Sequence, residues 1–266
     1  MKFTTMALIR AAAVSALAIF ATAEGASAQQ STLQKILSSG TLRVGTTGDY
    51  NPMTIFDPAT SSHKGYEIEA AQKLGADLGV KVEFVRTDWK TLIQGLTSDK
   101  YDILMSGTSF SVARLKVVAF SQPYNTYYMI GLVTKENAEK YKSWNDVNKK
   151  EVKVAVTLGT NFEGIAKEVL PNATLTRIEA PAREYQEILA GRADIGLTSS
   201  TEAAGLIKTY PNLRIVLADG KFGKQVHGYM MRQGDFAWVN YVNSWLNLRE
   251  ADGTLPGIRA KWLALE

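Results

Sequence analysis

A run of small hydroxyl residues stands five residues before an arginine near the middle of the chain. The run consists of Ser106, Gly107, Thr108 and Ser109, and Arg114 follows in a segment short enough for one helical turn. Hydroxyl and backbone N–H groups can donate to one oxygen of a carboxylate, and a planar guanidinium can hold both oxygens. Alternatively, Arg114 is a solvated helix residue and the hydroxyls only cap its helix. Spacing alone favours this second interpretation.

Aromatic residues follow two of the predicted strands. Residues 41–45 and 80–85 are predicted strands; Asp49 and Tyr50 follow the first, and Trp89 follows the second. Ligands of open α/β sheets bind beyond the carboxyl ends of the strands, where two aromatic faces would form an apolar slot for a flat ring or a cation. We predict that Trp89 begins a helix, so it could instead pack in the core. For Asp49 a ligand contact and a plain turn residue are equally favoured.

The second half of the chain has a polar helix start of its own. Gly159, Thr160 and Asn161 precede a predicted helix over residues 162–169. N–H groups and a hydroxyl at a helix N-terminus can bind an anionic oxygen. A plain helix cap is the alternative, and one residue can serve both roles. We expect Thr160 to contact a ligand.

Predicted strands and helices alternate along the chain. Apolar or alternating runs predict strands over residues 41–45, 80–85, 103–105, 152–156, 174–178, 193–197 and 213–216, with segments of helical periodicity between most of them. This alternation favours βαβ units and mostly parallel sheets. The fold class predicted is therefore α/β, with two doubly wound lobes joined by two hinge strands.

Two apolar strands, over residues 127–133 and 226–231, are predicted to cross between the lobes. The boundaries are residues 29–125 and 229–266 for lobe 1 and residues 126–228 for lobe 2, with hinge crossovers near 125–133 and 224–231. Such pairs of lobes close on a ligand, and a few crossover residues absorb the change in backbone angles.

The N-terminus has the form of a secretory signal. Lys2 and Arg10 give a positive start, residues 11–23 are apolar, and residues 26–28 are small enough for cleavage. The apolar stretch is shorter than the roughly 20 residues that span a bilayer, although an uncleaved membrane anchor is the alternative. We expect a cleavable signal peptide over residues 1–28 and an exported, periplasmic mature chain.

Composition argues against several classes of function. The 266 residues include no cysteine and carry a formal net charge of +4, so no disulfide framework or thiolate chemistry is expected. The basic residues form no stripe with aromatics, so nucleic acid is not an expected partner. His63 and His227 lie alone, and we expect no metal site and a structural role for His227. No phosphate-binding loop is present, and no cofactor is expected.

The central motif resembles a known family signature. Residues 102–124 read D-I-x-x-S-G-x-S-x-S-x-x-R-x-x-x-x-x-F-S-x-P-Y. This pattern is similar to that of the family 3 bacterial extracellular solute-binding proteins, periplasmic receptors for amino acids and similar small acids that supply ABC importers. The segment GTLPGIRAKW at residues 253–262 resembles the end of the same family. The resemblance implies a two-lobe periplasmic-binding-protein fold of type II and an inner-membrane ABC permease as partner, and we expect a monomer.

The resemblance also implies roles for individual residues. In this family an Arg at the position of Arg114 holds the ligand's α-carboxylate, helped by the hydroxyl at the position of Ser109. Amino-acid receptors usually carry an Asp at the position of Ser199 to pair with the α-ammonium. A hydroxyl cannot offset a buried ammonium charge. Either Asp49 or Glu202 therefore takes that role, or the ligand has no α-amino group.

Glu202 has two interpretations. Residues 199–202 read S-S-T-E, a capping box that satisfies helix donors without any ligand. The family also includes cyclohexadienyl (arogenate/prephenate) dehydratases, in which a Glu matching Glu202 is the general acid, a task that suits a buried carboxyl with a raised pKa. That branch carries a Lys shortly after the F-S-x-P-Y motif, where residues 125–129 here read N-T-Y-Y-M, and an Asp at the position of Ser199. These two departures favour a receptor.

The sequence therefore predicts a periplasmic receptor that captures a small carboxylate, such as an amino acid or a related organic acid, between its lobes. A cyclohexadienyl dehydratase is the alternative, with Glu202 as its catalytic acid. The expected ligand-binding residues are Asp49, Tyr50, Trp89, Ser106, Gly107, Ser109, Arg114, Thr160, Asn161, Ser199 and Glu202.

Overall fold

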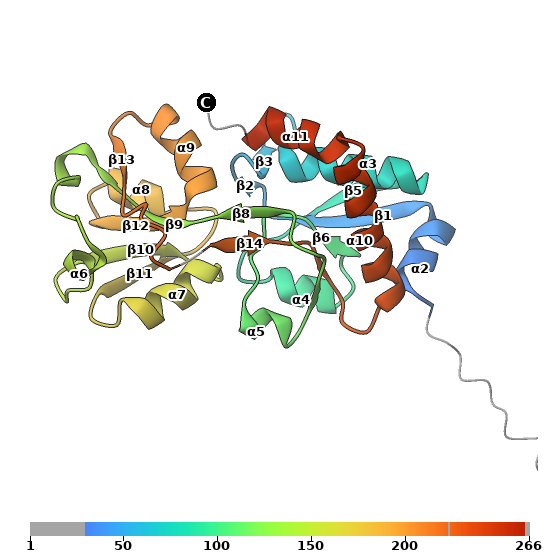
Figure 1. Ribbon diagram of the computed structural model, residues 1–266, viewed down its shortest axis with the longest axis horizontal. Helices are drawn as coiled ribbons and strands as arrows, with labels where there is room; N and C mark the ends of the chain where they lie inside the picture. Colours follow the sequence, from blue (N-terminus) through green and yellow to red (C-terminus); the bar gives the residue numbers. More distant parts are fainter. Residues whose placement is uncertain (1–29, 223, 264–266) are drawn as a thin grey trace, which may run out of the picture. The chain divides into compact units, whose positions relative to one another are not determined.

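Two five-stranded sheets organise the chain in the computed structural model, which describes residues 30–222 and 224–263 (Figure 1). The predicted signal peptide over residues 1–28 lies outside the described residues. Among the helices that are described, none is long and apolar enough to cross a membrane.

The first sheet has the strand order β5-β1-β6-β15-β7. Its strands are β1 (Thr41–Thr46), β5 (Lys81–Arg86), β6 (Ile103–Leu104), β7 (Ala119–Phe120) and β15 (Met230–Met231). The helices of this lobe are α2 (Thr32–Ser39), α3 (Tyr66–Leu78), α4 (Leu92–Thr97), α5 (Val112–Leu115), α10 (Phe236–Ala251) and α11 (Thr254–Leu263). The sheet core is apolar because Leu42 and Val44 of β1 and Ile103 of β6 are fully buried.

The second sheet has the order β11-β10-β12-β9-β13. Its strands are β9 (Met129–Thr134), β10 (Lys153–Thr157), β11 (Thr174–Ile178), β12 (Ile195–Ser199) and β13 (Leu213–Val216). Its helical elements are the 3-10 turn η1 (Lys135–Asn137) and helices α6 (Trp144–Val147), α7 (Asn161–Val169), α8 (Glu184–Leu189) and α9 (Ser200–Thr209). Helices α7, α8 and α9 each follow a strand of this sheet, as βα units require.

Both sheets are mostly parallel, as expected, but each contains one strand that runs antiparallel to the other four. In the first, β1 pairs in parallel with β5 and β6, but β15 is antiparallel to β6 and β7. In the second, β10 pairs in parallel with β11 and β12, but β9 is antiparallel to β12 and β13. In each sheet the antiparallel strand is one that the chain reaches directly from a crossing strand.

The two sheets are connected by a pair of short crossing strands. β8 (Asn125–Tyr127) and β14 (Gln225–His227) pair antiparallel and lie between the two sheets in Figure 1. The single apolar strands predicted over 127–133 and 226–231 are each divided, so that one part crosses and the next part joins a sheet. Gly228 stands at the second break, where a Cβ would come within 2.5 Å of the Phe110 ring. The residue boundaries of the lobes remain a prediction.

Local structure differs from expectation before two of the helices. Asp49 and Tyr50 form β2 (Asp49–Tyr50) of a small antiparallel sheet with β3 (Thr54–Asp57) and β4 (Ser62–Lys64), where a loop was expected. The prediction that Trp89 begins a helix is wrong, because α4 begins at Leu92. The Asp88 carboxylate accepts the backbone N–H groups of the two residues after Trp89, and this turn precedes the helix.

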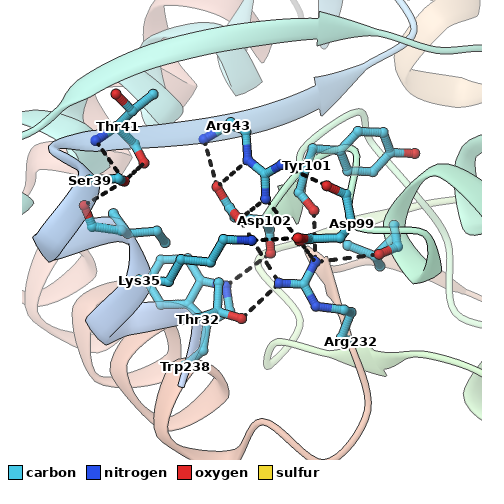
Figure 2. Close-up of polar contacts among 12 residues, drawn as sticks. Thr32, Lys35, Ser39, Thr41, Arg43, Asp99, Tyr101, Asp102, Arg232 and Trp238 are labelled. Atoms are coloured by element: carbon cyan, nitrogen blue, oxygen red, sulfur yellow. Dashed lines mark hydrogen bonds and ion pairs between the residues drawn. The ribbon is translucent and has the colours of Figure 1, made fainter. Parts of the chain in front are cut away.

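A network of ion pairs fixes the first lobe at the end where β1 begins (Figure 2). Asp102, which leads into β6, is 2% exposed and accepts the Nη2 of Arg43 at 2.6 Å. Asp99 receives Lys35, Arg43 and Arg232. The Asp102 hydrogen bond is the main reason why the pKa of Arg43 lies above its ordinary value. This network holds α2, the start of β1 and the segment before β6 together. Asp49 and Tyr50, which are candidate site residues, follow the opposite end of β1.

Candidate ligand-binding site

A cavity lined by aromatic and charged side chains lies between elements of the two lobes, with about 380 Å³ of empty space, part of it open to solvent. Its lining comprises Tyr50, Trp89, Gly107, Ser109, Arg114, Tyr127, Thr157, Thr160, Asn161, Phe162, Arg183, Glu184, Glu202 and His227. Eight of the predicted residues are among them: Tyr50, Trp89, Gly107, Ser109, Arg114, Thr160, Asn161 and Glu202. The remaining three, Asp49, Ser106 and Ser199, lie behind the lining.

Arg114 is a buried cation that has no counter-ion among the described residues. It lies in α5, whose N-cap Ser111 accepts the Arg114 backbone N–H, and the residue is 7% exposed. Its guanidinium donates to two backbone carbonyls, Ser109 O and Gly159 O, each at 2.9 Å. No carboxylate of the described residues lies within 4.0 Å of it. Burial lowers the pKa of Arg114 to about 10.

This geometry leaves Arg114 ready for an anion. A guanidinium has five N–H donors, and the two carbonyls accept only two of them. An unpaired buried charge is costly, and a carboxylate would both neutralise it and accept the remaining donors. Arg114 also joins the lobes, because Ser109 belongs to the first and Gly159 to the second.

The loop before Arg114 is held in place from behind. Gly107 has φ 62°, and a Cβ there would come within 2.6 Å of the Tyr50 ring. Its N–H donates to Oε1 of Glu67 at 2.8 Å, so this N–H is not available to a ligand. Burial raises the pKa of Glu67 to about 7. Ser106 is fully buried and hydrogen-bonds Thr47, which makes it a support for the loop.

The hydroxyl and amide groups of the lining are also engaged by the protein. Ser109 Oγ lies 2.5 Å from the hydroxyl of Tyr127. Thr160 Oγ1 donates to the carbonyl of Thr157 at 2.7 Å. Asn161 Nδ2 donates to the side chain of Gln225. These groups shape the cavity, and their contact with a ligand stays a prediction.

The aromatic pair meets edge to face. The ring centroids of Tyr50 and Trp89 are 6.0 Å apart, with an angle of 68° between the ring planes. The Tyr50 hydroxyl donates to Ser199 Oγ at 2.7 Å, a contact between the lobes. The Trp89 Nε1–H lies 3.0 Å from both carboxylate oxygens of Asp49. Asp49 thus fixes the indole that lines the cavity.

An arginine and three carboxylates gather at another part of the cavity. Arg183 Nη2 lies 2.7 Å from Glu202 Oε2, and Arg183 Nε lies 3.2 Å from Glu184 Oε2. Arg183 Nη1 donates to the carbonyl of Asp49 and is 3.7 Å from its carboxylate. Burial opposes the charge of Arg183, but Glu184, Glu202 and Asp49 raise its pKa well above the ordinary value.

Glu202 departs from the predicted capping box. Ser199 Oγ accepts the Glu202 backbone N–H at 3.0 Å, as a cap would. The Glu202 carboxylate does not return to the helix start; its Oε2 accepts from Thr198 Oγ1 and Arg183 Nη2. Burial, with the repulsion of Glu184 and Asp49, outweighs the attraction of Arg183 and raises the pKa of Glu202 to about 8. Oε1 has no hydrogen-bond donor among the described residues.

His227 lines the cavity in the neutral form. Its ring stacks on Tyr127, with centroids 4.4 Å apart, and one nitrogen lies 3.1 Å from Asn125 Nδ2. Burial and the nearby charge of Arg114 lower the pKa of His227 to about 3. The sequence indicated a structural role for this residue; the structure also places it at the site. Within the described ranges, no group of three or more His, Cys, Asp or Glu residues could hold a metal ion.

Sequence reasoning missed Arg183, Glu184, Tyr127, Thr157 and Phe162 as lining residues. Arg183 and Glu184 are adjacent and oppositely charged at the start of a helix, which usually indicates a solvated helix end. Their position is the only signal that could have identified them. They follow the carboxyl end of β11, the same edge of the sheet as the helix start after β10.

Two α/β lobes, joined by paired crossing strands and with a polar cavity between them, define a type II periplasmic binding protein. The family model of the bacterial extracellular solute-binding proteins, family 3, matches residues 42–265, and the chain belongs to this family.

Relatives within the family include an enzyme and transport receptors. The chain is 31% identical to a cyclohexadienyl dehydratase of Pseudomonas aeruginosa over 94% of this chain and 93% of the relative. It is 30% identical to the L-cystine-binding protein TcyJ of Escherichia coli over 90% and 88%. The crystal structure of the ancestral amino acid-binding protein AncCDT-1, titled a precursor of cyclohexadienyl dehydratase, is 42% identical with a TM-score of 0.82, over 88% of this chain and all of that one.

Proposed function

We propose that this protein is an exported receptor that binds a small carboxylate at Arg114 and delivers it to an ABC importer. The observation that carries the proposal is the buried guanidinium of Arg114, which donates to two carbonyls and has no carboxylate partner among the described residues. A fold that keeps an unpaired buried cation sacrifices stability, and an anionic ligand explains why the residue is retained. Amino-acid receptors among the relatives support the same function.

Closure of the lobes on the ligand belongs to this proposal. Polar contacts that join the lobes around the cavity include Tyr50 to Ser199 at 2.7 Å, Arg114 to Gly159 O at 2.9 Å, Lys90 to Glu179 at 2.8 Å, and Arg183 to the carbonyl of Asp49. These contacts are polar and few, and β8 and β14 are short, so the lobes can separate by changes at the crossing strands. Small-angle scattering should show a smaller radius of gyration when ligand is added.

The test of ligand class uses the mature chain, residues 29–266. Thermal unfolding is measured against neutral, acidic and basic amino acids and against matched 2-hydroxy acids, with prephenate and arogenate in the same panel. Ligand at a hundred times its dissociation constant adds about 2.7 kcal/mol to the free energy of unfolding. Stabilisation by an intact acid, lost in Arg114→Met, supports the receptor. If no acid stabilises the chain, the proposal fails.

A dehydratase remains the second candidate because of the geometry of Glu202. Both donors to its carboxylate reach Oε2, which leaves Oε1 as the place for a proton. With a pKa of about 8, the group is mostly protonated at neutral pH, as a general acid requires. Appearance of phenylpyruvate or phenylalanine from prephenate or arogenate, lost in Glu202→Gln, would establish the enzyme. A receptor would leave both substrates intact.

A further inference from the structure

The positively charged guanidinium of Arg183 lies at the cavity and fills part of it. Its backbone N–H donates to the side chain of Gln186 at 2.8 Å, which fixes the residue at the start of α8. From there the guanidinium reaches the cavity, and the residue is 6% exposed. Long charged side chains at helix starts usually extend into solvent, so this burial needs a cause.

The cause is a set of acceptors that surrounds the guanidinium. Glu184 lies at 3.2 Å from Nε and 3.4 Å from Nη2, and Glu202 lies at 2.7 Å from Nη2. The Asp49 carbonyl accepts from Nη1, across the gap between the lobes, and the Asp49 carboxylate lies 3.7 Å away. Acceptors on several sides in this arrangement match the spread donors of a guanidinium. We name this group the acidic cage: Asp49, Glu184 and Glu202.

The two arginines of the cavity are therefore in opposite environments. Arg114 is left without an anion, whereas Arg183 is surrounded by three carboxylates. The carboxyl groups of the acidic cage would hold a cation from a ligand if Arg183 were absent. The same cavity would then bind a carboxylate at Arg114 and a side-chain cation at the cage. AncCDT-1, to which this chain is 42% identical, is an ancestral cationic amino acid solute-binding protein.

We propose that Arg183 determines specificity by occupying, with its own guanidinium, the place where the side-chain cation of a basic amino acid would otherwise bind. This inference rests on the proposed function and names its ligand class: acids without a side-chain cation. A tethered group competes with a free ligand at an effective concentration of the order of millimolar or more. Displacing Arg183 would also break its hydrogen bond to the Asp49 carbonyl.

The first test compares ligand preference in three proteins. Calorimetric titrations of wild type, Arg183→Ala and Arg183→Lys use L-glutamine and L-phenylalanine as neutral ligands and L-arginine and L-lysine as basic ones. Arg183→Ala should shift the ratio of basic to neutral affinity by at least about tenfold toward the basic ligands. Arg183→Lys keeps a cation in place and should retain the wild-type preference. The control Arg192→Ala removes an exposed arginine of the same lobe that pairs with Glu187, and should change nothing. An unchanged ratio in Arg183→Ala overturns the proposal.

The second test does not depend on amino-acid binding. Ethylguanidinium at millimolar concentration is added during thermal unfolding of Arg183→Ala, of wild type and of the double variant Arg183→Ala/Glu184→Gln. It should raise the melting temperature of Arg183→Ala with saturation, leave wild type unchanged and act weakly on the double variant. Absence of a saturable effect on Arg183→Ala overturns the proposal even if amino acids bind. If ethylguanidinium raises the melting temperature of Arg183→Ala with saturation but the protein binds no carboxylate, the inferred cation-binding place is supported. The proposed receptor function is then rejected.

A variant that fails to fold would not prevent the test. Arg183→Gln keeps length and hydrogen-bonding capacity without the charge, and the preference shift toward basic ligands should also appear there. Since Arg183→Lys and Arg183→Gln differ mainly in charge, the pair separates charge from packing. Equal preferences in these two variants would contradict the inference.

Discussion

Replacing Arg114 by Met should weaken ligand binding strongly, with a smaller effect on the stability of the ligand-free protein. The side chain of Met fills much of the same space without a charge. Truncating one partner of a buried, hydrogen-bonded charge pair costs about 2–5 kcal/mol of binding free energy. This corresponds to a loss of affinity of roughly 30-fold to a few thousand-fold.

The effect on stability is the difference between two opposing terms. Burial lowers the pKa of Arg114 from 12.5 to about 10, which corresponds to a free-energy cost of ~3 kcal/mol for the charged guanidinium in the folded state. Removing Arg114 relieves this cost but leaves the carbonyls of Ser109 and Gly159 without their donor. A hydrogen bond to a charged group contributes about 1.5–3 kcal/mol. Two such bonds contribute about 3–6 kcal/mol, so the free energy of unfolding should fall by about 0–3 kcal/mol.

Calorimetric titration and urea unfolding of the same preparations measure the two quantities. Arg192→Met is the control, because Arg192 is exposed and pairs with Glu187, and exposed pairs contribute little. If Arg114→Met loses more than ~4 kcal/mol of stability and retains its affinity, then Arg114 is a structural residue. The assignment of the anion site would then be wrong.

Three further outcomes follow from the site. Because the pKa of Glu202 is raised from 4.5 to about 8, its contribution to stability is present below pH 4.5 and is lost as the pH rises through 8. Urea unfolding of Glu202→Gln between pH 5 and 8 should therefore show a flatter pH dependence, by up to about 1.4 kcal/mol per pH unit; parallel curves would contradict the assignment. The pKa of His227 is lowered from 6.5 to about 3, so its contribution is present above pH 6.5 and is lost as the pH falls toward 3. His227→Gln should be less sensitive to acid over that range, and an equal acid midpoint would reject a buried neutral imidazole. Trp89→Phe should remove most of the ligand-induced change in tryptophan fluorescence, because Trp89 lines the cavity; Trp144→Phe, a core change in the other lobe, is the control that should retain it.

Sequence patterns predicted the elements of the fold well where local chemistry is decisive. Strands over residues 174–178 and 213–216 have the predicted bounds. Helix α2 has Ser31 as its N-cap and Gly40, with φ 68°, as its C-cap, and both are residue types that local chemistry favours at helix ends. The split of each crossing strand could not be predicted, because one continuous apolar run serves both a crossing strand and a sheet strand. The mixed sheets follow from the same splits.

Site residues that lie in a sequence motif could be predicted. Site residues whose position depends on contacts with distant parts of the chain could not. Arg114 lies in a short helix after the loop of hydroxyl residues; spacing alone favoured a solvated helix residue, and only the family resemblance predicted that it belongs to the site. Arg183 has no motif. Its burial depends on Glu184, its neighbour, but also on Asp49 and Glu202, which are 134 and 19 residues away. Such a charge cluster forms only after both lobes fold.

The two arginines of the cavity, Arg183 and Arg114, differ in whether the protein itself explains their burial. Arg183 needs no ligand to explain its burial, because carboxylates from two helices compensate its charge. Arg114 has no such explanation, since an uncharged side chain at that position would avoid the cost of desolvation. The third charged element, Glu202, can adjust: with a pKa near 8 it can hold a proton in the ligand-free cavity and release it when a ligand adds a further cation. An α-ammonium beside Glu202 would therefore bind with release of a proton near neutral pH, whereas an organic acid without an amino group would not. The absence of an acidic residue at position 199 is thus compatible with an amino acid as ligand, because Glu202 can ionise when the α-ammonium binds and supply the compensating charge.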